Sequence, residues 1–174
     1  MSVHSLKEWN DLAAQLSPSR QMFINGKFED AASGKTFDTI NPATGEVIAA
    51  VAEGDQVDID RAVSAARNSF ERGVWSEEAP MNRKAVLLKL ADLIRENLDE
   101  LALLDSMDMG KTVEDAATVD VPGSALFFQW YAEAIDKIYD EVAPTGPGDL
   151  ALITREPLGV VGAVVPWNFP LDMA

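Results

Sequence analysis

The sequence contains no cysteine and only one histidine, His4, among its 174 residues. Without cysteine, these residues can form no disulfide, no thiolate metal site and no thiol nucleophile. A single histidine also argues against a histidine-based metal site and against a serine–histidine catalytic pair within this chain.

Positive charge is scarce too. Fourteen Lys and Arg residues stand against 29 Asp and Glu, which gives a formal net charge of −15. So acidic a surface repels nucleic-acid phosphates and anionic lipid headgroups, so we expect neither nucleic acid nor a membrane as a partner. The N-terminal residues do not resemble a signal peptide, and no apolar run reaches the length of a membrane span. We therefore expect a cytoplasmic protein.

The first part of the chain is patterned for one short helix and then strands. Apolar residues at helical spacing predict a helix over residues 4–16. The Asn25-Gly26 pair between apolar residues predicts a β-hairpin over 22–28. Two further strand-like runs cover 36–40 and 46–52.

Helical patterns follow. Asp55 is placed to cap a helix whose apolar face comprises Ile59, Val63, Ala66 and Phe70. A second helix is predicted from about Met81, and Gly110 is a predicted stop for the helical stretch after it. A further helix is predicted after Pro122-Gly123, and we expect its aromatic residues to pack in the core; these are Phe127, Trp130 and Tyr131.

The last part returns to strand patterns. Residues 151–156 alternate as a strand does, and 158–167 form an almost wholly apolar, β-branched run. Such a run is typical of a strand buried on both faces of a parallel sheet, which indicates an α/β protein. The chain supplies few neighbours for that strand, so we expect the domain to be incomplete or to be completed by another chain.

Asn168 is the candidate functional residue. It lies in Pro166-Trp167-Asn168-Phe169-Pro170, directly after the predicted buried strand. Ligands of open α/β sheets bind near the carboxyl ends of the strands, and a rigidly held amide donor suits an oxyanion-stabilising site. The alternative is that Asn168 only caps the turn after the strand.

An ordered set of motifs resembles the aldehyde dehydrogenase superfamily. The motifs occur in the order and at the spacing of that family, from Met22 to the end of the chain. They are Phe23-Ile24-Asn25-Gly26, Asn41-Pro42-Ala43-Thr44-Gly45-Glu46-Val47, Leu90-Ala91-Asp92-Leu93-Ile94, Asp108-Met109-Gly110-Lys111, Trp130-Tyr131-Ala132, residues 154–162 and Pro166-Trp167-Asn168-Phe169-Pro170.

The resemblance implies oxidation of an aldehyde to a carboxylic acid with NAD or NADP. In the family a cysteine thiolate attacks the aldehyde, hydride passes to the nicotinamide, and a glutamate-activated water releases the acid. Residues 57–62, 70–73 and 131–137 most resemble the bacterial enzymes that act on aminoaldehydes from polyamine breakdown, such as γ-glutamyl-γ-aminobutyraldehyde dehydrogenases.

The resemblance also implies roles for individual residues near the end of the chain. Asn168 matches the catalytic asparagine whose side chain, with a backbone N–H, holds the oxyanion. Val165, Pro166 and Trp167, together with Asn168, match the strand end that lines the nicotinamide side of the cofactor site.

A structural sodium or potassium ion is implied at Ile40 and Asp108, held largely through backbone oxygens. Hard cations prefer such oxygen ligands. The alternative for Asp108 is a solvent-facing residue near a helix end.

The implied fold is α/β, the N-terminal portion of the aldehyde dehydrogenase fold, with an incomplete Rossmann-like cofactor domain and a β extension for oligomerisation. On this division, residues 1–21 form an N-terminal helical segment and 22–141 the first part of the cofactor domain. Residues 142–160 are the β extension, and 161–174 are the first core strand and the active-site turn.

The chain lacks two residues on which the family's reaction depends. The family's nucleophilic cysteine and general-base glutamate lie beyond Ala174, and Lys111 and Glu156, although on matched motifs, are not at those positions. We therefore expect the isolated chain to be inactive and the full-length enzyme to be a dimer or tetramer. The alternative is a non-catalytic module that docks on a full-length subunit. Asp172 stands where relatives usually carry an apolar residue.

Overall fold

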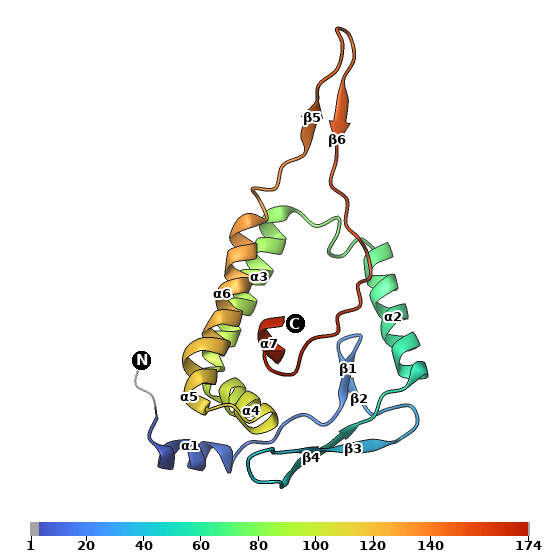
Figure 1. The fold of residues 1–174 in the computed structure, drawn as a ribbon. Helices are drawn as coiled ribbons and strands as arrows, with labels where there is room; N and C mark the ends of the chain where they lie inside the picture. Colours follow the sequence, from blue (N-terminus) through green and yellow to red (C-terminus); the bar gives the residue numbers. More distant parts are fainter. Residues whose placement is uncertain (1–3, 174) are drawn as a thin grey trace.

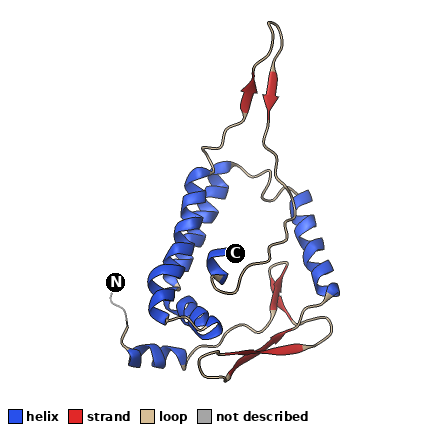
Figure 2. Ribbon diagram, in the orientation of Figure 1, coloured by secondary structure: helices blue, strands red, loops and turns tan. Residues whose placement is uncertain are grey.

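The computed structural model describes residues 4–173 (Figure 1). Short strands form the base and a projecting arm, and helices lie between them (Figure 2). In chain order the elements are α1 (Leu6–Ala13), β1 (Met22–Ile24), β2 (Lys27–Glu29), β3 (Thr36–Ile40), β4 (Val47–Ala52), α2 (Gln56–Glu71), α3 (Pro80–Glu96), α4 (Leu98–Met109), α5 (Val113–Asp115), η1 (Ala116–Asp120), α6 (Val121–Ala134), β5 (Glu141–Ala143), β6 (Ala151–Ile153) and α7 (Pro170–Met173).

The strands form three separate antiparallel pairs, β1–β2, β3–β4 and β5–β6. Asn25 and Gly26 both have positive φ, 53° and 76°, as a two-residue hairpin turn requires. The predicted hairpin over 22–28 is therefore confirmed, as are the strands predicted over 36–40 and 46–52. The β5–β6 hairpin, hereafter the arm, projects from one end of the molecule (Figure 1).

Local capping explains where the helices begin and end. Ser5 and Glu8 form a capping box at the start of α1, within the predicted helix over 4–16. The Asp55 carboxylate accepts from the Val57 N–H, which confirms the predicted cap of α2. Gly110, at φ 88°, ends α4 in the left-handed conformation, as predicted.

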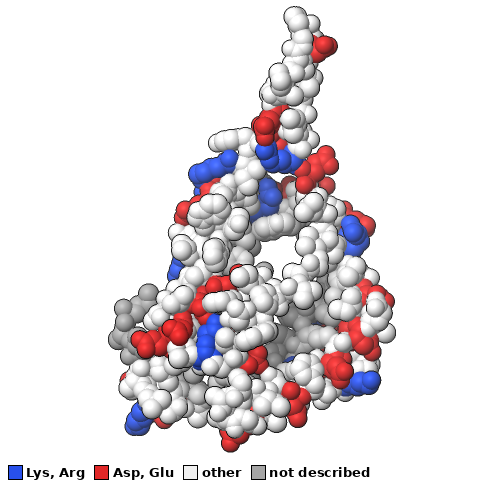
Figure 3. Space-filling model, viewed as in Figure 1, with Lys and Arg blue, Asp and Glu red and all other residues white. Residues whose placement is uncertain are grey.

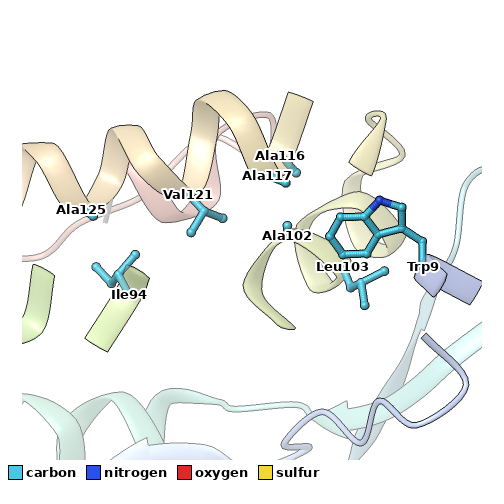
Figure 4. Close-up of a cluster of buried hydrophobic side chains, with 8 residues drawn as sticks. All are labelled: Trp9, Ile94, Ala102, Leu103, Ala116, Ala117, Val121 and Ala125. Atoms are coloured by element: carbon cyan, nitrogen blue, oxygen red, sulfur yellow. The ribbon is translucent and has the colours of Figure 1, made fainter. Parts of the chain in front are cut away.

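The core is small and lies among α1, α3, α4, η1 and α6 (Figure 4). Alanine residues dominate it, so the helices approach one another closely, and Trp9 is its one large aromatic side chain. Its buried members are Trp9, Ile94, Ala102, Leu103, Ala116, Ala117, Val121 and Ala125. Leu171 of α7 packs against this cluster from the far end of the chain.

The predicted core face of α2 is wrong for this chain. Ile59 and Val63 are exposed, and the one buried residue of the helix is Asp58. Its carboxylate accepts from the N–H groups of Ala32 and Asp55 and pairs with Arg61. No other layer of the described chain covers the apolar side of α2, whereas these polar contacts tie the helix to the segment after β2.

The helix predicted after Pro122-Gly123 begins slightly earlier. It starts at Val121 and continues directly from η1, because proline is tolerated in the first helical turn. The expected burial of its aromatic residues is also wrong for this chain. Phe127, Trp130 and Tyr131 are all more than half exposed, since α3 covers only the opposite side of α6.

The interior strand predicted over 158–167 does not form. This run is extended but pairs with no strand of the described chain, and Leu158 and Val164 are 94% and 101% exposed. A buried parallel strand needs partners on both sides, and every strand in residues 4–173 is already part of a hairpin. The apolar sequence is suited to burial that this chain cannot provide alone.

The surface carries many more acidic than basic side chains, as the composition indicates (Figure 3). In residues 4–173 no helix combines the length and the apolar character needed to cross a membrane.

Gly110 provides a test of the contact between the end of α4 and the β3–β4 loop. A Cβ added there would lie 2.7 Å from Cγ of Pro42, a ring atom that cannot rotate away. Gly45 also has positive φ, 77°, but a Cβ there meets nothing within 4 Å. Gly45→Ala should lower the free energy of unfolding by about 1–2 kcal/mol through the left-handed backbone alone. Gly110→Ala should lower it further, as measured by urea denaturation; equal losses would contradict this packing.

Asp136 provides a test of the ion pairs that its carboxylate makes after the end of α6, with Lys137 and with Lys84 of α3. Hydrogen bonds from Lys137 and then Lys84 lower the pKa of Asp136 from 3.8 to about 2. A carboxyl whose folded pKa is depressed adds stability above its unfolded pKa and loses it as the pH falls through the folded value. Asp136→Asn should therefore flatten the decline in urea midpoint between pH 4 and pH 2.

The matched control is Asp149→Asn. Asp149 is an exposed residue between β5 and β6, and its side chain makes no hydrogen bond within the described residues. This variant should lose stability with falling pH as the parent does. If Asp136→Asn does the same, the contacts of Asp136 with Lys137 and Lys84 contribute nothing to stability.

Candidate active site

Asn168 lies in a turn between the extended run 158–167 and α7. It is half-buried, and its backbone carbonyl is hydrogen bonded. Among the described residues no hydrogen bond involves its side-chain amide, so the alternative that Asn168 caps the turn through its side chain is not supported. The amide remains available for a ligand.

The other predicted cofactor-lining residues are on the same turn but lie open. Val165 is 38% exposed, Trp167 is 75% exposed and Pro166 is exposed too. They lie at the end of the unpaired run 158–167, where the sequence predicted the end of a strand. The space-filling view shows the molecule hollowed between the α3–α6 pair and α2, below the base of the arm (Figure 3). These residues alone therefore do not close a pocket around the turn.

Lys111, in the loop after α4, fastens the turn to the helical core. Its Nζ donates to the Asn168 carbonyl oxygen at 2.9 Å and lies 4.6 Å from the centre of the Phe169 ring. It pairs at 3.2 Å with the carboxylate of Asp105, in α4, and also with that of Asp120, in η1. All three charged side chains are at most 10% exposed. We call Lys111, Asp105 and Asp120 the lysine cluster.

Burial and pairing act in opposite directions on the pKa values of the lysine cluster. Burial raises the pKa of Asp105, and Lys111 opposes this shift without cancelling it. Burial would lower the pKa of Lys111, but hydrogen bonds to Asp120 and Asp105 and their negative charge outweigh it, so that pKa is raised. The ammonium is thus protonated at neutral pH, while Asp105 bears the cost of desolvation. Its Oδ1 atom is buried without a hydrogen-bond partner in the described chain.

A second polar contact holds α7, which follows the turn. The buried Ser124 hydroxyl lies within hydrogen-bond reach of two acceptors, the Asp172 carboxylate and, at 2.9 Å, the Asp120 carbonyl, and shares its one hydrogen between them. Gly123 lies beside this contact, and a Cβ there would be in ordinary van der Waals contact with Asp172 Oδ1, at 3.5 Å. Asp172, the departure from the family pattern noted in the sequence, therefore has a defined partner.

The predicted cation-site residues are brought near each other. Thr39, next to Ile40 in β3, donates its hydroxyl hydrogen to the carboxylate of Asp108, in α4. Asp108 is exposed but bonded, so it is not a plain solvent-facing side chain. Residues 4–173 contain no cluster of three or more His, Cys, Asp or Glu that could bind a metal, so an ion here would depend on backbone oxygens.

A cavity of about 520 Å³ lies beside these residues and under α7. Its walls are largely apolar and come from β3, β4, α4 and α7. Asp105, Asp108, Pro170 and Leu171 line it, but Asn168 does not. The cavity is therefore on the core side of the turn.

Sequence reasoning did not identify the lysine cluster or the Ser124–Asp172 contact. One signal was present: Asp105 follows the apolar run from Leu101 to Leu104, and Asp120 precedes Val121. A carboxylate in an apolar helical stripe indicates a buried partner, although not which residue that partner is.

The chain matches proteins of one family. Residues 28–174 match the aldehyde dehydrogenase family. The NADP/NAD-dependent aldehyde dehydrogenase PuuC of Escherichia coli is 52% identical over 171 residues, covering 98% of this chain and 34% of that protein. The aminoacetaldehyde dehydrogenase of Pseudomonas aeruginosa is 48% identical over 169 residues, covering 97% and 34%.

A solved structure agrees in backbone as well as in sequence. The γ-glutamyl-γ-aminobutyraldehyde dehydrogenase of Burkholderia cenocepacia superposes with a TM-score of 0.96 at 50% identity, covering 98% of this chain and 34% of that one. The exposed run and the arm thus follow the path that they take in a much longer protein. The chain spans about a third of the length of the relatives described here.

The predicted fold, the N-terminal portion of the aldehyde dehydrogenase fold, is confirmed. So is the resemblance to bacterial enzymes for aminoaldehydes, through the relatives from P. aeruginosa and B. cenocepacia. From its motifs, its backbone and these relatives, the chain belongs to the aldehyde dehydrogenase family.

Proposed function

We propose that this chain supplies the oxyanion-stabilising amide, Asn168, to an enzyme that oxidises an aldehyde to a carboxylic acid with NAD or NADP. The overall reaction takes an aldehyde, the oxidised cofactor and water to the carboxylate, the reduced cofactor and two protons. We further propose an aminoaldehyde from polyamine breakdown as the substrate; the P. aeruginosa and B. cenocepacia relatives are both named for aminoaldehydes. A cytoplasmic homo-oligomer is the expected form of the enzyme.

One observation carries the proposal: the Asn168 backbone carbonyl is hydrogen bonded, while its side-chain amide has no hydrogen-bond partner among residues 4–173. Attack on an aldehyde carbonyl moves negative charge onto the carbonyl oxygen. An N–H donor that is already in place stabilises that charge without reorganising as the reaction proceeds. A stiff turn bearing one unengaged amide has the properties that this task requires.

The remaining chemistry depends on groups outside these 174 residues. The chain contains no cysteine, so the thiolate that attacks the carbonyl has to come from elsewhere in the enzyme. The nicotinamide, when bound, accepts the hydride. We assign Val165, Pro166 and Trp167 to the cofactor side of the turn, where exposed apolar surface is available to be covered.

A hybrid enzyme tests the role of Asn168. Residues 1–174 are joined to the part of E. coli PuuC that follows its matched segment, which is feasible at 52% identity. Asn168→Ala should lower kcat about 10²–10³-fold while the KM for the aldehyde changes little, because the lost donor acts mainly in the transition state. Steady-state formation of the reduced cofactor measures both constants.

The matched control removes the same side chain from a surface site. Asn10 is exposed on α1, so Asn10→Ala should leave kcat unchanged. The unfused 174-residue chain should give no aldehyde-dependent turnover. The proposal fails if Asn168→Ala behaves like Asn10→Ala, or if the unfused chain turns over the aldehyde.

We also propose that Ile40 and Asp108 contribute oxygen ligands to a structural sodium or potassium ion. The Thr39–Asp108 hydrogen bond supports this, because it holds the two elements together where such an ion would bind. A bound cation stabilises the folded state by mass action. The hybrid should therefore melt at a higher temperature in NaCl or KCl than in choline chloride at equal ionic strength. Asp108→Ala should reduce the difference, because it removes the bond from Thr39 that holds the two elements together. No difference in the parent hybrid would refute the site.

A second function is favoured by the exposed apolar surface. The run 158–167 and the arm present Leu158, Val164, Val142 and Leu152 to solvent. An unpaired edge of this kind can bind another chain, so the alternative is a module that docks on a full-length subunit. Light scattering of the 18.9 kDa chain, alone and with purified PuuC, tests it. A monomer that does not bind PuuC would rule out the module.

A further inference from the structure

We propose that Lys111 is a positioning residue, which holds the Asn168 peptide in place so that the amide meets the oxyanion. The catalytic role of Lys111 rests on the proposed function. The contact between Lys111 and the Asn168 backbone does not, because it is made within this chain. Lys111 touches neither substrate nor cofactor in this proposal; it acts through the backbone of Asn168.

The ammonium of Lys111 has three N–H donors, and three acceptors surround it. They are a carboxylate oxygen of Asp105, a carboxylate oxygen of Asp120 and the carbonyl oxygen of Asn168. Two of the acceptors belong to the helical core and the third to the turn. The contacts to Asp120 and Asn168 are hydrogen bonds and that to Asp105 is an ion pair at 3.2 Å, so one ammonium links the turn to both α4 and η1.

Few other polar contacts hold this part of the chain. Among the described residues, the bond from Lys111 is the only hydrogen bond that joins residues 158–168 to a part of the chain distant in sequence. After the turn, α7 is held through Ser124–Asp172 and through the packing of Leu171. The Lys111 bond is thus the last fixed point before the open run begins.

The Phe169 ring adds a second contact on the same ammonium. It lies 4.6 Å from Nζ, within the range of a cation–π interaction. The carbonyl of Asn168 and the ring of the next residue are therefore held by one charge, which fixes both sides of the Asn168–Phe169 peptide bond. This arrangement restrains the Cα atom from which the Asn168 amide extends.

Small errors in the position of such a donor are costly. An oxyanion donor has to lie about 2.7–3.1 Å from the developing charge, and a displacement of about 1 Å can reduce the rate about 10²-fold. If Lys111 acts through Asn168, its loss should lower kcat by up to that factor and leave KM nearly unchanged. A purely structural lysine cluster would instead lower stability without changing kcat in the enzyme that remains folded.

The test needs a variant that does not leave two buried carboxylates without a counter-charge. Lys111→Met alone would do so and could prevent folding. The triple variant Lys111→Met/Asp105→Asn/Asp120→Asn removes all the charge at similar side-chain volume. The control is Asp105→Asn, which leaves the Lys111–Asp120 ion pair intact and keeps Lys111 beside the Asn168 carbonyl.

The first readout is NMR of the ¹⁵N-labelled 174-residue chain. The Phe169 amide nitrogen belongs to the peptide whose carbonyl accepts from Lys111, so its chemical shift reports that bond. In the triple variant this shift should move and the heteronuclear NOE of residues 167–169 should fall, whereas signals of α3 and α6 stay in place. In the control they should remain as in the parent. Signals of 167–169 that do not change in the triple variant would overturn the proposal.

The second readout is a double-mutant cycle in the hybrid enzyme. The triple change should lower kcat when Asn168 is present and have no further effect on kcat in the Asn168→Ala background. Independent losses that multiply would show that Lys111 does not act through Asn168. If Asn168→Ala alone leaves kcat unchanged, the proposed function is overturned, and so is the catalytic role of Lys111. Unchanged NMR signals instead overturn the Lys111 contact and leave the proposed function standing.

Discussion

The turn that carries Asn168 depends on a buried ion pair. Lys111 is surrounded by Asp105 and Asp120, and its third donor reaches a backbone oxygen 57 residues along the chain. Burying three charges is costly, and the raised pKa of Asp105 reflects that cost. Hydrophobic residues of similar volume would give a core at least as stable. The charged residues instead make a specific contact, because an ammonium can donate a hydrogen bond to one particular carbonyl and an apolar side chain cannot.

Features set by neighbouring residues could be predicted from the sequence. Asn25-Gly26 makes its turn because both residues accept positive φ, Asp55 caps α2 with its own side chain, and Gly110 ends α4. In the site, Asn168 could be selected as an amide on a stiff turn. The lysine cluster could not, because nothing local connects Lys111 to Asn168, and the Ser124–Asp172 contact is equally remote in sequence.

Burial was the property predicted least well, for a physical reason. The sequences of α2, α6 and residues 158–167 are suited to apolar surroundings, and Ile59, Trp130 and Val164 would be buried if those surroundings were present. Hydrophobic periodicity indicates which face of a helix or strand is suited to burial. It does not indicate whether the segment that covers this face belongs to the same chain. Similarity to a much longer structure, over the same backbone path, accounts for this mismatch.

The two chain segments at the base of the arm are joined by contacts of Arg155. Arg155 bonds the carbonyl of Tyr139 and the carboxylate of Glu141, and its N–H donates to Asp140 at 3.0 Å. These contacts tie together the two chain segments that enter and leave the hairpin. Changes of length or composition at the Pro- and Gly-containing tip are thereby isolated from the backbone leading to Asn168. A change at the tip can therefore alter any binding by the arm without moving the turn that carries Asn168.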